Sequence, residues 1–488
     1  MSSPRSLKRT VYRSQVGEDS SEREPLLSDV EEVQALSRNV PEVKRQLGEE
    51  QSSPHKQNTY YPTGPISIYA TPNLILRASG SIGLFFIMWL LGVAVAATGM
   101  AVYVEFGTGL PYSGGEKNYL EYIFKKHKLL ATCCFAMPCC LMGWAAANSV
   151  VFGEYLIHAL GDEITQWNTR LIGWTCLTCI TLMHALYLNW SLRIQNTLAI
   201  VKLGILFFLI ISGLLVLFRI ISIPNRPDNF SNIWEGTRQD PNAWVSGLYS
   251  VIWCFDGYSN AHYALSETKD PVKTLKRAAP IAMGLISFMY LLVNVSYVTV
   301  VSKYDILNGG RVIAALFFRN IFGSIAEKIL SIVICISTFG NILAVTFAQS
   351  RAIQALGREG ILPYSKEFAT NSRFNTPTGA LFLQWFACTF WMMVPPPGDA
   401  YNFVLNLLIY PTGLVNAVIA GGLIWLYLSP YGTQNWQPPF RAGLTVVIAF
   451  FLSNIFLSVA PLIPPTPEFS LYEYLPYWVG IQLYAVQK

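Results

Sequence analysis

The stretch that decides the fold reads QNTLAIVKLGILFFLIISGLLVLF and spans residues 195–218. Lys202 is its only ionisable residue. The stretch is longer than the roughly 20 apolar residues that a helix needs to cross a bilayer. It therefore predicts a transmembrane helix, and the chain on either side repeats the same pattern.

Comparable runs with few or no charges recur along the chain, and with residues 195–218 they give ten clear spans: Ser81–Val104, Leu129–Leu160, Leu171–Ser191, Ala243–Leu265, Ala278–Val301, Ile329–Gln349, Thr378–Pro396, Tyr401–Leu428 and Ala442–Ile463. Two weaker segments, Gln57–Leu76 and Leu471–Lys488, flank them. We therefore expect an all-α polytopic integral membrane protein with nominally twelve spans, of which the first and last are incomplete.

The composition agrees with a membrane protein that carries a polar tail. Of the 488 residues, 52% are hydrophobic and 13% are charged, whereas soluble domains average about 25% charged residues. Residues 1–56 alone hold 19 of the charged residues and little hydrophobic periodicity, which predicts a disordered tail. The tail lacks the apolar segment of a signal peptide at its start, so we expect it to be cytoplasmic.

Modification of this tail is one hypothesis for its role. Lys8, Lys44 and Lys56 lie among several serines and are candidate sites for control of trafficking by a ubiquitin ligase or an arrestin-type adaptor. An unregulated, solvated tail explains the composition equally well.

Cations between the spans predict the orientation. The loops 105–128, 266–277 and 350–377 each carry four Lys or Arg residues and fall on the same side of the ten spans. Cytoplasmic loops carry an excess of Lys and Arg, so this side is expected to be cytoplasmic, with the N-terminus on the same side.

A cytoplasmic tail requires one crossing before residue 81, and only Gln57–Leu76 can supply it. Pro62, Pro65 and Pro72 make this segment a poor continuous helix. Irregular backbone is tolerated at membrane depth only where it is buried in protein or lines a cavity. The first crossing is therefore expected to be either a broken helix beside a binding site or a span of which part is missing from this chain.

A second interruption is predicted at WCFDGY, residues 253–258, in the middle of an apolar span. Glycine permits non-helical torsions, and aspartate can bond the freed backbone groups. A broken helix offers N–H groups to a carboxylate at one end and C=O groups to an ammonium at the other. Interruptions in the first and sixth crossings match a five-plus-five inverted repeat and predict a transporter that binds a zwitterion between them.

Isolated polar residues inside the spans are further candidates. A buried amine at Lys202 suits charge neutralisation, replacement of a bound cation or proton exchange; the alternative is that it snorkels to the cytoplasmic surface. Asn148 and Asn341 either face a cavity or bond a neighbouring helix.

Enzymatic function has no support in the sequence. The nine cysteines lie inside apolar stretches, where a thiol usually packs as a small hydrophobe. We find no cluster at metal-ligand spacing, no nucleophile elbow and no phosphate-binding glycine loop. We therefore expect no enzyme, no cofactor, no metal and no nucleic acid partner.

Three motifs carry a family resemblance. They are EFGTGLPYSGGEKNY at residues 105–119, FDGY at 255–258 and GREGILP at 357–363. Together they resemble the amino acid permeases of the amino acid–polyamine–organocation superfamily. Two segments, GGEKNYLEY at 114–122 and GWAAANSVVFGE at 143–154, are similar in sequence to the corresponding segments of the fungal high-affinity methionine permeases.

The resemblance implies a leucine-transporter-type bundle in the plasma membrane that imports a small neutral amino acid, with methionine favoured, in symport with protons by alternating access. It also implies a transport core at 57–428, with inverted repeats at about 57–218 and 243–428, and accessory helices at 429–488. The alternative is a nutrient sensor or regulatory paralogue that does not transport. Lys202 matches the family's coupling lysine, and the implied substrate-binding residues are Ser67, Ile68, Tyr69, Asn148, Trp253, Cys254, Phe255, Asp256, Gly257, Tyr258 and Asn341.

The first crossing departs from the family pattern. Ala70, Thr71 and Pro72 match, but the family's Gly-Thr-Gly falls on residues 65–67, where this chain has Pro, Ile and Ser. A proline there removes a backbone N–H that a substrate carboxylate would use.

Overall fold

The structure is a computed structural model, and it describes most of the chain after residue 65. The described residues are 66–112, 114–124, 128–224, 226–255, 257–259, 261–262, 265, 268, 270–310, 312–358, 360, 362–374, 376–394 and 400–459. The tail predicted for residues 1–56 and the prolines at 62 and 65 lie outside this part.

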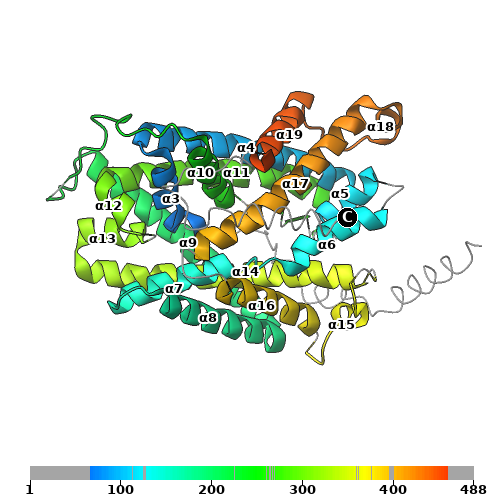
Figure 1. Ribbon diagram of the computed structural model, residues 1–488, viewed down its shortest axis with the longest axis horizontal. Helices are drawn as coiled ribbons and strands as arrows, with labels where there is room; N and C mark the ends of the chain where they lie inside the picture. Colours follow the sequence, from blue (N-terminus) through cyan, green and yellow to red (C-terminus); the bar gives the residue numbers. More distant parts are fainter. Residues whose placement is uncertain are drawn as a thin grey trace, which may run out of the picture. The chain divides into compact units, whose positions relative to one another are not determined.

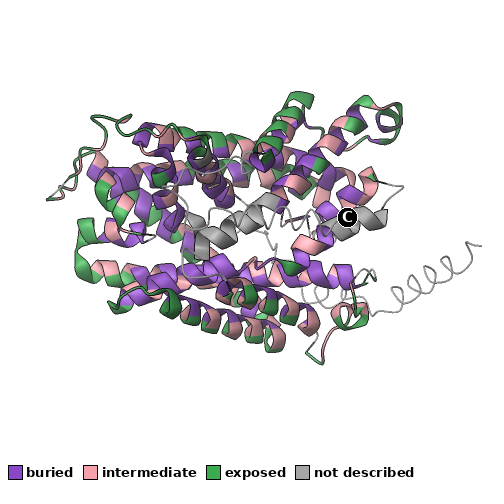
Figure 2. Ribbon diagram, in the orientation of Figure 1, coloured by how far each residue is buried: buried purple, intermediate pink, exposed green. Residues whose placement is uncertain are grey.

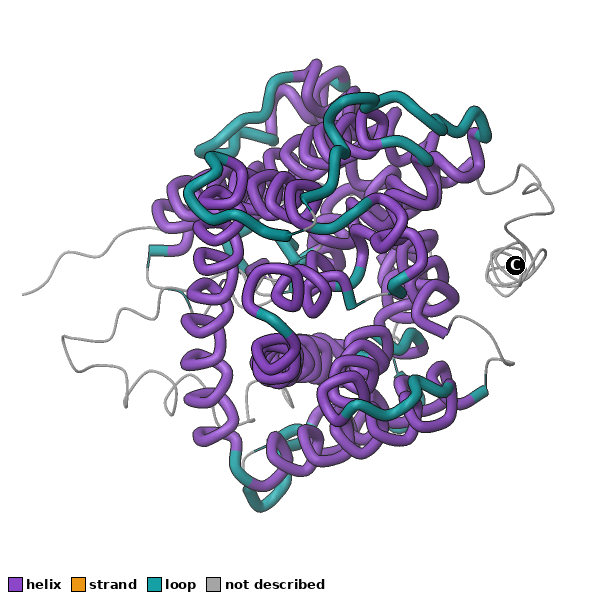
Figure 3. The backbone as a smooth tube through the Cα atoms, turned by 90° about the vertical axis from the view of Figure 1, so that its left-hand side faces the viewer, coloured by secondary structure: helices purple, strands orange, loops and turns teal. Residues whose placement is uncertain are grey.

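The described chain consists of helices joined by loops, and it contains no strand (Figure 3). In chain order the helices are η1 (Ile66–Tyr69), α3 (Thr71–Ser79), α4 (Ile82–Gly109), α5 (Glu116–Ile123), α6 (Lys128–Leu141), α7 (Ala146–Leu160), α8 (Gln166–Leu186), α9 (Leu188–Leu217), α10 (Pro241–Phe255), α11 (Pro271–Val300), α12 (Lys303–Asn308), α13 (Ile313–Phe322), α14 (Ser324–Arg358), α15 (Ser365–Ala369), α16 (Thr378–Met393), α17 (Ala400–Leu428), α18 (Pro430–Asn435) and α19 (Leu444–Val459).

Six helical segments in the described part are long and apolar enough to cross a membrane. They are Ile82–Gly109, Phe135–Leu160, Leu188–Leu217, Pro271–Val300, Ser324–Arg358 and Pro411–Leu428. Shorter apolar helices at Ala243–Phe255, Ile313–Phe322 and Leu444–Val459 accompany them. These helices, and the large apolar side chains exposed on them, are those expected of the predicted all-α polytopic membrane protein.

The helices pack in two groups with α17 between them (Figure 1). In one group α14 packs against α7, α8, α9 and α16; in the other α4 packs against α10, α11 and α19. α17 contacts α5, α7, α10 and α19, and so touches both groups. Figure 2 shows α14 largely buried among its neighbours, whereas the outer face of α8 is exposed.

Each of the ten predicted spans contains a helix, but Leu129–Leu160 is not one continuous helix. It divides into α6 and α7 at residues 142–145. Pro138 cannot donate a backbone hydrogen bond, and its carbonyl accepts one from Trp144 Nε1 at 3.3 Å. Gly143 lies so close to α16 that an added Cβ would meet the Cys388 Cα at 3.1 Å. α6 continues through Pro138 to Leu141, so the feature at the break itself is the close approach of Gly143 to α16.

The described half of the first crossing is interrupted, as predicted. A 3₁₀ turn, η1, ends at Tyr69, and α3 begins at Thr71 with Pro72 in its first turn. Proline is well tolerated there, because the first amides of a helix have no partner within the helix. The N-cap residue is Ala70, which makes no side-chain hydrogen bond to those amides.

The sixth predicted crossing is interrupted as well. α10 ends at Phe255, and residues 257–259 form a turn in place of a continued helix. Gly257 has φ +130°, a torsion that residues with a side chain rarely adopt. Asp256 lies outside the described residues.

Candidate functional site

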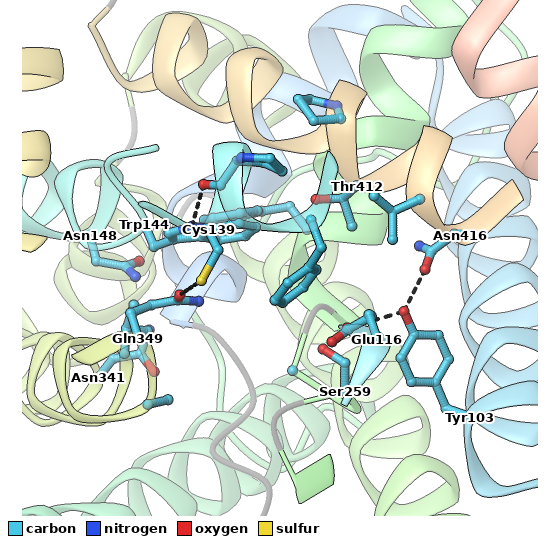
Figure 4. Close-up of a pocket in the computed structure, with 18 residues that line it drawn as sticks. Tyr103, Glu116, Cys139, Trp144, Asn148, Ser259, Asn341, Gln349, Thr412 and Asn416 are labelled. Carbon is cyan, nitrogen blue, oxygen red and sulfur yellow. Dashed lines mark hydrogen bonds between the residues drawn. The ribbon is translucent and has the colours of Figure 1, made fainter. Parts of the chain in front are cut away.

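A cavity of about 90 Å³ lies beside the end of α10. It is large enough for several water molecules. Figure 4 shows its lining, which comes from α4, α5, α6, α7, α10, α14 and α17: Tyr103, Glu116, Phe135, Pro138, Cys139, Trp144, Asn148, Trp253, Gly257, Ser259, Asn341, Val345, Ala348, Gln349, Pro411, Thr412, Val415 and Asn416. The cavity thus lies where the two helix groups and α17 meet.

The broken helix forms one wall of this cavity. Trp253, in the last turn of α10, and Gly257 and Ser259, in the turn that follows, all line it. The indole Nε1 of Trp253 has no hydrogen-bond partner in the described part of the chain. A buried donor without a partner costs free energy, so this N–H favours a polar occupant of the cavity.

Two asparagines line the cavity from the other helix group. Asn148 lies on α7 and Asn341 on α14, and both are buried. Figure 4 shows them on the same side of the cavity, near Gln349. Within the described residues the Nδ2 of Asn341 makes no hydrogen bond, so it is a second donor available to a polar occupant.

The interrupted first crossing packs directly behind the α10 wall. The Thr71 hydroxyl lies 3.0 Å from the Cys254 sulfur, which joins the start of α3 to the end of α10. The carbonyl of Tyr69 accepts a hydrogen bond from the Tyr155 hydroxyl at 2.7 Å. The structure therefore brings the two predicted interruptions into contact.

Several predicted binding residues are packed away from the cavity in this conformation. Ile68, Tyr69 and Cys254 are fully buried and are not among the described lining residues. Phe255 packs in an edge-to-face arrangement on Trp89, with ring centroids 6.2 Å apart. The Tyr258 ring packs on Tyr103 at 5.2 Å. The side chains of Ser67 and Asp256 lie outside the described part.

Lys202 interacts electrostatically with Cys254, a residue of α10. It is buried on α9, and its ammonium is within electrostatic range of the Cys254 sulfur. Cys254 is also the residue that contacts Thr71. The amine therefore interacts electrostatically with a residue at the junction of the two interrupted helices, and Lys202 is not among the described residues that line the cavity.

Sequence reasoning missed the other end of the cavity. The Tyr103 hydroxyl lies 3.1 Å from Glu116 Oε1 and 2.7 Å from Asn416 Oδ1, which joins α4 to α5 and α17. Cys139 Sγ lies 3.8 Å from Gln349 Oε1. The charge pattern places Glu116, within the motif at residues 105–119, in a loop between two spans. The signal that could have found it is the segment EKNYLEYI, residues 116–123, whose apolar residues predict a partly buried helix.

A cavity walled by a broken helix, inside a bundle of membrane-crossing helices, defines a membrane transport protein. The family described as "Amino acid permease" matches residues 62–486 of the chain. The protein therefore belongs to the amino acid permease family, within the amino acid–polyamine–organocation superfamily, and is a transporter of amino acids rather than an enzyme.

The chain is also similar to particular members of this family. The chain is 40% identical over 455 residues to the high-affinity methionine permease of Saccharomyces cerevisiae, covering 93% of this chain and 79% of the relative. It is 29% identical to the low-affinity methionine permease of the same yeast, over 81% of this chain and 72% of the relative. The human b(0,+)-type amino acid transporter 1 is 25% identical, over 82% and 80%.

Proposed function

We propose that this protein imports methionine, or a neutral amino acid of similar shape, across the plasma membrane in symport with protons. The observation that carries this proposal is the cavity beside the α10 break, which combines unused hydrogen-bond donors with apolar and aromatic walls. The printed names of two yeast relatives support methionine as the substrate.

The polar half of the substrate would bind at the two broken helices. The N-terminal amides of α3 favour a carboxylate, and the C-terminal carbonyls of α10 favour an ammonium. These two helix ends are adjacent, since Thr71 contacts Cys254. Trp253 Nε1 and Asn341 Nδ2 supply further donors. The proposed substrate-binding residues are thus Ser67, Ile68, Tyr69, Asn148, Trp253, Cys254, Phe255, Asp256, Gly257, Tyr258 and Asn341.

The apolar half would bind against the remaining walls. Phe135, Trp144, Val345 and Val415 line the cavity with aromatic and aliphatic surface. A thioether is apolar and polarizable and makes favourable contacts with aromatic rings. The same surface accepts leucine-like side chains. Selectivity for methionine over leucine would therefore depend on the side chains at these four positions.

Coupling would involve Lys202. Its ammonium lies beside Cys254, close to the junction of α3 with α10. When protonated, this amine stabilises the carbonyl end of α10 in the way that a bound cation would. We propose that this charge keeps the start of α3 next to the end of α10 during transport.

The proposed organisation follows the same family pattern. Residues 57–428 would form the transport core, with inverted repeats at about 57–218 and 243–428, and residues 429–488 the accessory helices. The cationic loops would place the N-terminal tail, residues 1–56, in the cytoplasm. That tail would then be available to a ubiquitin ligase or an arrestin-type adaptor.

Uptake by proteoliposomes tests the proposal. The purified full chain is reconstituted, and entry of labelled methionine is measured with and without an inward proton gradient. Accumulation that depends on the gradient and is inhibited by unlabelled methionine is the expected result. Binding of methionine without any flux would overturn transport and favour a nutrient sensor.

A further inference from the structure

The end of the cavity away from the α10 break carries an acidic side chain. Glu116, the first residue of α5, is the only charged residue among the described residues that line the cavity. It is 6% exposed, so the surrounding protein covers most of its surface. Figure 4 shows its carboxylate directed toward the Tyr103 hydroxyl.

Hydrogen bonds around this carboxylate involve four segments of the bundle, of which α4 contacts it directly through Tyr103. Tyr103 comes from α4 and Asn416 from α17, and the Tyr103 hydroxyl contacts both Glu116 and Asn416. On α5 the Tyr119 hydroxyl lies 2.6 Å from Nδ1 of His262, which follows the α10 break. A change of charge at Glu116 therefore acts where α4, α5, α17 and the chain after α10 are joined.

Among the described residues that line the cavity, Glu116 is the carboxylate that can accept a proton. Burial raises the pKa of Tyr119 well above its usual value, and the Glu116 charge adds to this. Tyr119 therefore keeps its proton. The described groups near Glu116 are Tyr103 on α4, Lys117 and Tyr119 on α5, and Cys139 on α6. His262 lies one side chain further away, and the described neighbour on α17 is the neutral Asn416. Lys117 is paired with Glu121 at 3.3 Å.

We propose that Glu116 is the residue that takes up and releases the coupled proton, an inference that rests on the proton symport proposed above. A proton from water binds one carboxylate oxygen and gives the neutral acid. Its release to cavity water restores the carboxylate, and no electrons are exchanged.

The coupling follows from the hydration of this site. Closing the cavity removes water from around Glu116 and favours the neutral acid, whereas opening it admits water and favours the ionised carboxylate. A hydrogen bond from Tyr103 to an ionised carboxylate is stronger than one to the neutral acid. Opening of the cavity therefore releases the proton, and the proton's departure strengthens the contact of α4 with α5.

The test compares Glu116→Gln with Glu121→Gln in full-length protein reconstituted in proteoliposomes. Glutamine keeps a hydrogen-bond acceptor for Tyr103 but cannot ionise. Glu121 lies on the same helix and is not among the lining residues, so it is the matched control. Two quantities are measured for each protein: counterflow exchange of labelled methionine without a gradient, and accumulation driven by a proton gradient.

We expect Glu116→Gln still to exchange methionine but to lose accumulation driven by the gradient, down to the level reached without one. Glu121→Gln should behave as the unmodified chain. Gradient-driven accumulation by Glu116→Gln equal to that of the unmodified chain would overturn the role of Glu116 alone. An unmodified chain that exchanges methionine but ignores the gradient would instead overturn proton symport itself.

A second variant keeps the proposal testable if Glu116→Gln does not fold. Tyr103→Phe retains the carboxylate but removes the hydroxyl that stabilises its ionised form. The pH midpoint of uptake should therefore move to higher pH by about one unit. An unchanged midpoint in a variant that still transports would overturn the assignment.

Discussion

The hydroxyl of Thr71 lies 3.0 Å from the sulfur of Cys254, although 183 positions separate the two residues in the sequence. Each stands at the broken end of a helix: Thr71 begins α3, and Cys254 is the penultimate residue of α10. The contact holds a positive helix end next to a negative one. A zwitterion needs both ends at once, so the relative position of these two residues sets the geometry of the proposed site.

Removing this contact should weaken transport. Thr71→Val keeps the shape of the side chain but replaces the hydroxyl with a methyl group. A lost hydrogen bond of about 1 kcal/mol corresponds to roughly a fivefold fall in methionine uptake at limiting concentration. The measurement is the initial rate of labelled methionine uptake, with Thr71→Ser as the matched control. Equal rates for Thr71→Val and the unmodified chain would show that the contact does not position the site.

Removing the buried amine should abolish coupled uptake without unfolding the protein. Lys202→Ala deletes the charge beside Cys254, and the helix ends lose the cation that we propose to stabilise them. Gradient-driven accumulation should be lost, while the protein elutes as a single species in detergent. Lys328→Ala, at an exposed position near the start of α14, is the control. Undiminished accumulation by Lys202→Ala would exclude a coupling role for this residue.

The unused amide of Asn341 should contribute to substrate affinity. Asn341→Leu has a similar size but removes the donor Nδ2 that faces the cavity without a partner in the described chain. The loss of one substrate hydrogen bond, about 1 kcal/mol, should raise the apparent KM for methionine roughly fivefold. The check is a concentration series of uptake, with the exposed Asn308→Leu on α12 as control. A KM that stays the same would place Asn341 outside the substrate contact.

The sequence predicted the bundle and its two interruptions because both depend on local chemistry. A run such as 195–218 must be a helix in lipid, since no other backbone satisfies its own hydrogen bonds there. Gly257 and Pro72 each act on their own backbone, so the breaks near them follow from residue type. The break between α6 and α7 was not predicted, because its cause is partly the close approach of α16 to Gly143.

The site was only partly predictable from the sequence, because part of it depends on tertiary packing. Asn148, Trp253, Gly257 and Asn341 were proposed from sequence, and all four line the cavity. Glu116 was not proposed, because its burial depends on helices α4 and α17, whose contact with α5 is set by tertiary packing. Which polar residues share a cavity is a property of the whole bundle, and a single sequence does not specify it.

Glu105 should be a major determinant of stability at the end of α4. Its fully buried carboxylate accepts hydrogen bonds from Trp436 Nε1 at 2.8 Å, from the Ala442 backbone N–H at 2.7 Å and from the Tyr427 hydroxyl. These donors come from α17, the segment after α18 and the segment before α19, so one side chain ties three segments to α4. Glu105→Ala would leave the Trp436 indole N–H and the Ala442 amide buried without their acceptor, whereas the Tyr427 hydroxyl keeps the Ala442 carbonyl at 2.7 Å.

Such a loss should lower the free energy of unfolding by about 3 kcal/mol, a figure typical of breaking a buried, hydrogen-bonded charged group. Thermal unfolding in detergent can be followed with a thiol-reactive dye, because the buried Cys139, Cys140, Cys254 and Cys388 become accessible on unfolding. Glu121→Ala removes a carboxylate that is only partly buried on α5 and should change the midpoint little. If Glu105→Ala unfolds at the same temperature as Glu121→Ala, the three hydrogen bonds do not stabilise the end of α4.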